Sequence, residues 1–242
     1  MFFLLTDYGD NGPYTGQIKS ILIKNAPGVP IIDLFNNLPS FRPDLSSYLI
    51  PAYTNNQIKG GIFLCIVDPG VGGSRRPLVI FADDRWYVGP DNGLFSQILR
   101  QAMTLKCWEI KPISKVSSKT FHGRDIFAPI AAKIFSGSQD EFLFKIPIPE
   151  IDISMPADTN RIIYIDHFGN LITGIRGNTL PFNAKIKVGS LIIDRAETYD
   201  DVEHGKCFWY INSNGLIEVA ASRQSAKEIL RLDVGDSFSI YN

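Results

Sequence analysis

This chain of 242 residues is short of cysteine, of net charge and of long apolar runs. Its three cysteines, Cys65, Cys107 and Cys207, are odd in number and far apart, and no CxxC pair occurs. We therefore expect neither a disulfide framework nor a cysteine zinc site. This pattern is typical of a protein kept in the reducing cytoplasm.

The charges nearly cancel, because 24 lysines and arginines face 25 aspartates and glutamates, for a net charge of −1. A chain this balanced carries no overall basic footprint for nucleic acid or for an anionic membrane. No apolar stretch approaches the ~20 residues of a membrane span. The apolar start at residues 2–5 is too short for a signal peptide. We expect a small-molecule partner, and neither a nucleic acid nor a membrane.

The first part of the chain alternates strand-like and helix-like patterns. Together they predict an α/β/α layered domain over residues 1–150 with a largely parallel sheet. Within it, Pro51 should kink a helix or end it early. The predicted strands are 2–6, 29–34, 61–67, 77–82 and 85–88, and the predicted helices lie near 13–26, 42–55, 94–99 and 124–135.

Residues 145–160 carry Pro147, Pro149 and Pro156 without a helical period, which indicates a linker. Beyond the linker, short strands predict a second, smaller domain over 158–242, a β-barrel or a sandwich. Asn214-Gly215 between two apolar runs is a strong signal for a tight hairpin. The predicted strands are 161–166, 171–175, 185–193, 206–211 and 215–220, with one short helix near 223–231.

Polar residues follow or precede predicted elements in three loops, 6–10, 68–76 and 120–125. Ligands of open α/β sheets bind outside the carboxyl ends of the strands. Taken singly, each loop could be a capped turn or a solvated segment. Together, Asp68 at a strand end and His122 before a helix could form, with an arginine, a group that activates water.

Five motifs in these segments share their order and spacing with one family. They are TDYG, VDPGVGGSRRPL, YVGPDNGLFS, TFHGRDIFAP and IDHFGNLITGI, and the match runs from residue 4 to about 230. The chain resembles the SAM hydroxide adenosyltransferases, relatives of the fluorinating and chlorinating enzymes that use S-adenosyl-L-methionine (SAM). The resemblance implies hydrolysis of SAM to adenosine and L-methionine, through attack of activated water or hydroxide at C5′ of the ribose. It implies no cofactor and no metal.

The resemblance also implies an N-terminal α/β domain, a C-terminal β-barrel and a homotrimer. SAM would lie between the N-terminal domain of one subunit and the C-terminal domain of its neighbour. The catalytic, water-activating residues would be Asp68, Arg75 and His122. The substrate-binding residues would be Asp7 for the ribose hydroxyls, Asp166 for the methionine amino group, Asn170 with Phe168 of the FGN motif for the adenine, and Ser213 for the methionine carboxylate.

Three other functions stay open at this point. A halide-using SAM transferase would carry tyrosine where His122 stands, so His122 favours water. A metal-dependent nucleoside hydrolase would bind calcium through an acidic loop such as TDYGDN, but Gly12-Pro13 removes the next carboxylate. A non-catalytic SAM- or adenosine-binding module would not need the intact catalytic set. Gly12 and Gly73 depart from the family pattern, which has Asp and Thr or Ser there.

Overall fold

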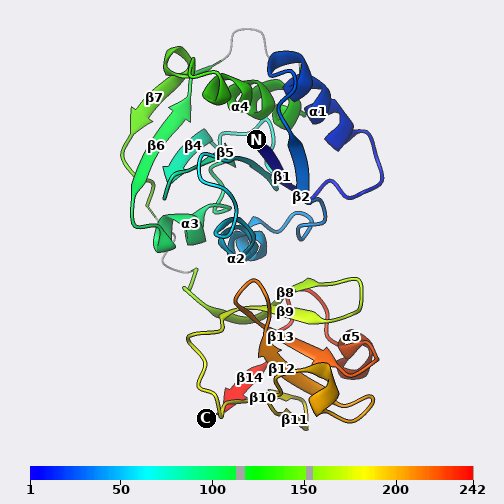
Figure 1. Cartoon of the computed structure of the whole chain (residues 1–242). Coiled ribbons are helices and arrows are strands. Elements are labelled where there is room, and N and C mark those ends of the chain that lie inside the picture. The colour runs from blue at the N-terminus through cyan, green and yellow to red at the C-terminus, as the bar shows by residue number, and fades with distance from the viewer. Residues whose placement is uncertain (113–117, 151–154, 242) are drawn as a thin grey trace. The chain divides into compact units, whose positions relative to one another are not determined.

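The computed structural model describes residues 1–112, 118–150 and 155–241. The chain divides into two compact units, Met1–Met155 and Pro156–Asn242 (Figure 1). Each unit has its own apolar core and is described here by itself. None of the helices in the described ranges is long and apolar enough to cross a membrane.

Unit 1 is built on a sheet in which the described residues contribute seven strands, in the order β2-β1-β3-β5-β4-β6-β7. β1, β2, β3 and β5 pair in parallel, and β6 runs in their direction because β4 is antiparallel to both β5 and β6. Only β4 and β7 run the other way. The predicted α/β domain with a mostly parallel sheet is confirmed. The strands are β1 (Phe2–Thr6), β2 (Ile31–Phe35), β3 (Ile62–Ile66), β4 (Pro77–Ala82), β5 (Arg85–Pro90), β6 (Leu105–Ile110) and β7 (Leu143–Ile146).

Helices cover both faces of this sheet, with α1 and α4 on one side and α2 and α3 on the other (Figure 1). Side chains alternate along β1, so Phe2 and Leu4 pack with Ile18 of α1, while Phe3 stacks on Phe63 on the opposite face. Burial on both faces explains why the central strands read as unbroken apolar runs. The helices are α1 (Tyr14–Asn25), α2 (Pro43–Thr54), α3 (Ser96–Gln101) and α4 (Ala128–Phe135), with a π-helical turn over Gly123–Phe127.

The structure differs from expectation at Pro51, because α2 continues past it to Thr54. The carbonyl of Pro51 still accepts a hydrogen bond from the Asn55 N–H at 3.0 Å. Leu49 and Ile50 are fully buried beside it. Packing of the surrounding turn outweighs the hydrogen bond that proline cannot donate.

Unit 2 holds smaller antiparallel sheets, one with the strand order β12-β13-β9-β8 and one with β11-β10-β14. Isolated bridges join Arg161 to Ser237 and Arg195 to Trp209, at the edges of the two sheets. The predicted strand 185–193 is a hairpin, since Gly189 turns the chain with a φ of +59°. The elements are β8 (Thr159–Ile165), β9 (Leu171–Arg176), β10 (Lys185–Val188), β11 (Leu191–Ile193), β12 (Cys207–Ile211), β13 (Leu216–Ala221), α5 (Ala226–Leu230) and β14 (Ser239–Tyr241).

Candidate functional site

An ion pair between Asp68 and Arg75 lies at the end of β3. Arg75 Nε is 3.0 and 3.1 Å from the two carboxylate oxygens of Asp68, and Arg75 Nη2 donates to Oδ2 as well. The Asp68 side chain is only 6% exposed and the Arg75 side chain only 9%. The guanidinium also lies 5.5 Å from the ring centroid of Phe127. A two-pronged, buried contact of this kind fixes the orientation of the arginine.

His122 completes the group, because its Nδ1 lies 2.8 Å from Arg75 Nη2. A guanidinium only donates hydrogen bonds, so Nδ1 accepts and the neutral ring carries its proton on Nε2. Burial and, next, the charge of Arg75 lower the pKa of His122, while Asp68 and Asp125 oppose the shift. The neutral form of the imidazole is therefore the one that this site favours near pH 7.

The GPDNG motif holds the loop that carries these residues. Asn92 Nδ2 donates to the carbonyl of Val67 at 2.9 Å, one residue before Asp68. Gly89 passes so close to β3 that a Cβ there would lie 2.1 Å from the Cys65 carbonyl oxygen. Only glycine fits at that approach, so this motif acts as a support for the loop of Asp68.

Asp7 reaches the same edge of the sheet. Thr6 of β1 is in register with Ile66 of β3, so the two parallel strands end side by side. Burial raises the pKa of Asp7, with a smaller contribution from Asp68, while the Phe41 N–H bonded to Oδ2 at 3.1 Å opposes the rise. Asp7, Asp68 and His122 line one hollow of about 300 Å³. The structure thus brings together the three loops that the sequence singled out.

Phe41 also lines this hollow, and sequence reasoning missed it. The residue is 73% exposed, and its backbone is left-handed with a φ of +60°. That conformation costs a non-glycine residue about 1–2 kcal/mol. It places the Phe41 N–H on the Asp7 carboxylate. No local pattern in the sequence signals this conformation, because the partner is 34 residues away.

In unit 2, Asp166 organises the FGN turn between β8 and β9. Its Oδ1 accepts from the N–H groups of Phe168 and Asn170, each at 2.9 Å, and its Oδ2 accepts from Asn170 Nδ2 at 2.8 Å. Gly169 has a φ of +82°, and a Cβ there would lie 2.1 Å from Ser225 Oγ. The turn therefore needs both the carboxylate and the glycine of the DHFGN sequence.

A hollow of about 670 Å³ opens beside this turn. Phe168 and Asn170 line it, together with Tyr199 and Arg223, which sequence reasoning missed. Ser213 lies in the hairpin turn between β12 and β13, where the neighbouring Gly215 pairs with Gly177. By backbone pairing this is the opposite end of β9 from Asn170, and the role of Ser213 stays a prediction.

A buried acid next to this hollow was also missed. Glu218 is 6% exposed in β13 and accepts from Tyr210 Oη at 2.5 Å and from Asn212 Nδ2 at 3.0 Å. Burial raises the pKa of Glu218, and the two donors oppose the rise. A single acid inside the apolar run LIEVAA was the available signal.

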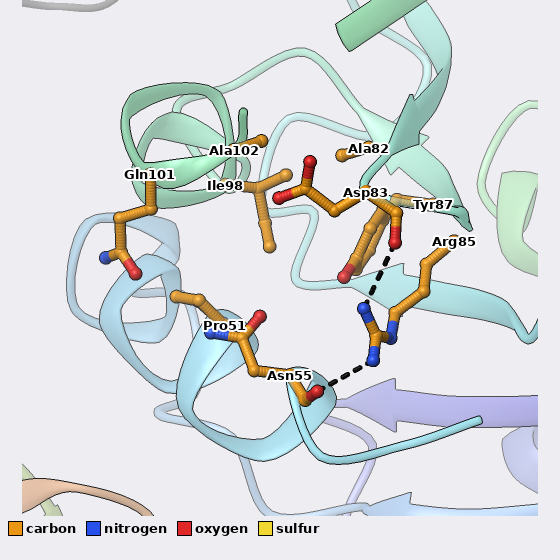
Figure 2. Close-up of a pocket in the computed structure, with 9 residues that line it drawn as sticks. All are labelled: Pro51, Asn55, Ala82, Asp83, Arg85, Tyr87, Ile98, Gln101 and Ala102. Carbon is orange, nitrogen blue, oxygen red and sulfur yellow. Dashed lines mark hydrogen bonds between the residues drawn. The ribbon is translucent and has the colours of Figure 1, made fainter. Parts of the chain in front are cut away.

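A further hollow in unit 1, of about 210 Å³, lies between the turn after β4, α2 and α3 (Figure 2). Arg85 reaches across it and donates to the carbonyls of Asp83 and Asn55, at 3.2 and 2.7 Å. The Asp83 carboxylate accepts from the N–H groups of Met103 and Thr104. These polar groups tie the turn after β4 to the residues that follow α2 and α3.

Comparison with known proteins decides the family. The profile of the SAM hydroxide adenosyltransferase N-terminal domain matches residues 2–143, and that of the C-terminal domain matches residues 160–239. The chain belongs to the SAM hydroxide adenosyltransferase family. The N-terminal match contains Asp68, Arg75 and His122, and the C-terminal match contains Asn170.

Relatives of this family member include an (R)-S-adenosyl-L-methionine hydrolase of Thermus thermophilus, 34% identical over 96% of both chains. The enzyme of the same name from Salinispora tropica is 28% identical over 97% of this chain and 95% of its own. A fluorinase of Actinopolyspora mzabensis is 20% identical over 98% and 95%. A crystal structure of an uncharacterized conserved protein from Thermotoga maritima matches all of both chains at a TM-score of 0.90 and 27% identity.

The acidic loop that suggested calcium binding gains no support from the fold of this family member. Among residues 1–112, 118–150 and 155–241, no group of three or more His, Cys, Asp or Glu side chains is arranged to hold a metal ion. Asp10 instead accepts a hydrogen bond from Asn37 Nδ2 at 2.7 Å.

Proposed function

We propose that this chain hydrolyses SAM to adenosine and L-methionine, by attack of activated water or hydroxide at C5′ of the ribose. The hydrolases among its relatives match nearly its whole length. The observation that carries the proposal is Arg75, which bonds Asp68 and His122 at the hollow that Asp7 also lines.

The reaction needs a well-held nucleophile more than it needs an acid. As the C5′–O bond forms, the C5′–S bond breaks and its electrons return to a positively charged sulfur, so methionine leaves neutral. Arg75 would lower the pKa of a bound water, whose proton passes to solvent, and would stabilise the hydroxide that remains. Asp68 holds Arg75 in place. His122, with its proton on Nε2, would donate to the oxygen and align it with C5′.

The family resemblance supports the substrate contacts that we propose, and the two hollows support those of Asp7, Phe168 and Asn170. We assign Asp7 to the ribose hydroxyls, Asn170 and the exposed ring of Phe168 to the adenine, and a remaining lone pair of Asp166 to the methionine amino group. We assign Ser213, in the turn between β12 and β13, to the methionine carboxylate on the family resemblance alone.

We further propose a cytoplasmic homotrimer with active sites that combine the N-terminal domain of one subunit with the C-terminal domain of its neighbour. The family resemblance supports the assembly, and the free cysteines Cys65, Cys107 and Cys207 suit a reducing compartment. We also propose that the C-terminal domain is a small barrel. The bridges at Arg161 and Arg195 support closure, because each lies at an edge of the two sheets.

The test is incubation of the protein with SAM, with chromatographic detection of the products. We expect adenosine and methionine in equal amounts, and formation of both roughly 10²–10³-fold slower with Arg75→Ala under the same conditions. Retention of unchanged SAM would identify a binding module. Formation of a 5′-halogenated adenosine in the presence of halide would identify a halide transferase. Either result would overturn the proposal.

A further inference from the structure

The turn between β12 and β13 is built around the side chain of Asn212. Its Oδ1 accepts from the backbone N–H groups of Asn214 and Leu216, at 3.0 and 3.1 Å. Its own N–H donates to the Leu216 carbonyl at 2.8 Å, and its carbonyl accepts from the Gly215 N–H at 2.9 Å. Ser213 lies within this set of bonds, so the orientation of the Asn212 amide determines the backbone shape that carries Ser213.

Glu218 holds that amide from the neighbouring strand. Asn212 Nδ2 donates to Glu218 Oε2 at 3.0 Å, while the amide oxygen faces the turn. Tyr210 is paired with Glu218 across the ladder and donates from Oη to Oε1 at 2.5 Å, which fixes the carboxylate itself. A rotated Asn212 amide would place its oxygen against the carboxylate and its N–H groups against those of the turn.

The core of unit 2 gives no reason for an acid at this position of β13. Glu218 is 6% exposed, and Ile217 and Val219 on either side of it are buried apolar residues. Burial of a carboxylate is costly unless its oxygens are hydrogen-bonded, and glutamate is disfavoured in strands. The bond to Asn212 is therefore the contact through which this acid can serve a site.

We propose that Glu218, acting through Asn212, is a positioning residue that holds Ser213 in contact with the methionine carboxylate of SAM. The proposal rests on the proposed function, which assigns Ser213 to that carboxylate. A negative charge on Glu218 would by itself repel a carboxylate ligand, so a direct charge effect and the positioning effect have opposite signs. Loss of the charge alone would favour SAM, whereas loss of the bond to Asn212 would weaken its contact with Ser213.

The experiment compares kcat/KM for SAM and for decarboxylated SAM, which has no carboxylate for Ser213 to contact. We expect Glu218→Leu and Asn212→Ala, which break the link from either side, to reduce the preference for SAM by roughly 5- to 30-fold. Glu218→Gln should retain it, because the amide oxygen accepts from Asn212 while its nitrogen donates to Tyr210. Tyr210→Phe is the matched control, since it removes the other donor to the same carboxylate.

The double variant Glu218→Leu with Ser213→Ala tests whether the effect passes through Ser213. It should lose no more of the preference than Ser213→Ala alone, because both changes remove the same contact.

A general loss of packing would slow the hydrolysis of both compounds alike. The positioning role is overturned, and the proposed function is left intact, by a wild-type protein that hydrolyses both compounds equally well. An unchanged preference in Glu218→Leu and Asn212→Ala, equal losses in Glu218→Leu and Glu218→Gln, or additive losses in the double variant would do the same. A wild-type protein that does not hydrolyse SAM overturns both.

Discussion

Arg75 is the side chain on which the candidate site depends, because it contacts both Asp68 and His122. The sequence placed Asp68 and His122 at the ends of predicted elements, and the family resemblance added Arg75 to them. It could not supply the tautomer of His122, which follows from a bond between atoms 47 residues apart. Sequence reasoning missed Phe41 because its partner Asp7 is 34 residues away. It missed Glu218 because the signal was a single acid in an apolar run.

Truncation of the proposed water-activating residues should reduce turnover far more than SAM binding. We expect His122→Ala and Arg75→Ala each to lose roughly 10²–10³ in kcat, or ~2.7–4 kcal/mol, because each supports charge that develops on the nucleophile. If the residues act as one unit, the double variant should lose little more than either single variant. Calorimetry of SAM binding alongside steady-state kinetics checks both statements, with exposed His204→Ala as the control. Near-normal turnover in His122→Ala would remove the histidine from the mechanism.

The activity should fall on the acid side as His122 becomes protonated. Burial and Arg75 lower its pKa below the ordinary 6.5, so the neutral ring that accepts from Arg75 persists into mildly acidic solution. We expect the acid limb of kcat/KM to have a midpoint below 6.5, and the same limb to be absent from the residual activity of His122→Ala. Because the unfolded state binds this proton more readily, the contribution of His122 to stability should also decline as the pH falls below about 6.5. A midpoint above 6.5 would contradict this environment for His122.

Among the elements, β5 and the GPDNG motif determine whether the loop of Asp68 keeps its shape. Gly89→Ala would drive a Cβ into the Cys65 carbonyl, so we expect a loss of about 1–3 kcal/mol in the free energy of unfolding. Gly16→Ala is the matched control, because nothing lies within 4 Å of its added Cβ and α1 should gain ~0.5–1 kcal/mol. Urea unfolding followed by tryptophan fluorescence measures both. Equal stability of the two variants would show that the close approach of β5 to β3 is not needed.

Helices and strands with a clear apolar pattern in the sequence were predictable, and those without such a pattern were not. β1 and β3 are fully buried runs, and α1 and α4 carry clear helical faces. β6 was missed because its buried and partly exposed residues do not alternate regularly. Three-residue β14 is too short for any period to appear. In each case pairing with a distant strand defines the element.

At the scale of the whole molecule, the proposed sites between subunits can be tested by complementation. Asp7 and Asn170 would act on the same ligand from different chains. Mixing inactive Asp7→Ala and Asn170→Ala proteins, after dissociation and reassembly, should therefore restore part of the wild-type activity. Light scattering should report a trimer for the wild-type protein. A fully active monomer, or mixtures that stay inactive after subunit exchange, would contradict the assembly.

Hydrolysis in ¹⁸O-labelled water tests the central claim most directly, because it reports which carbon the oxygen attacks. Mass spectrometry of the products should find the label on the 5′-hydroxyl of adenosine and none in methionine, since the water oxygen replaces sulfur at C5′. Release of free adenine, with the label on C1′ of the ribose, would contradict the account and indicate glycosidic cleavage instead.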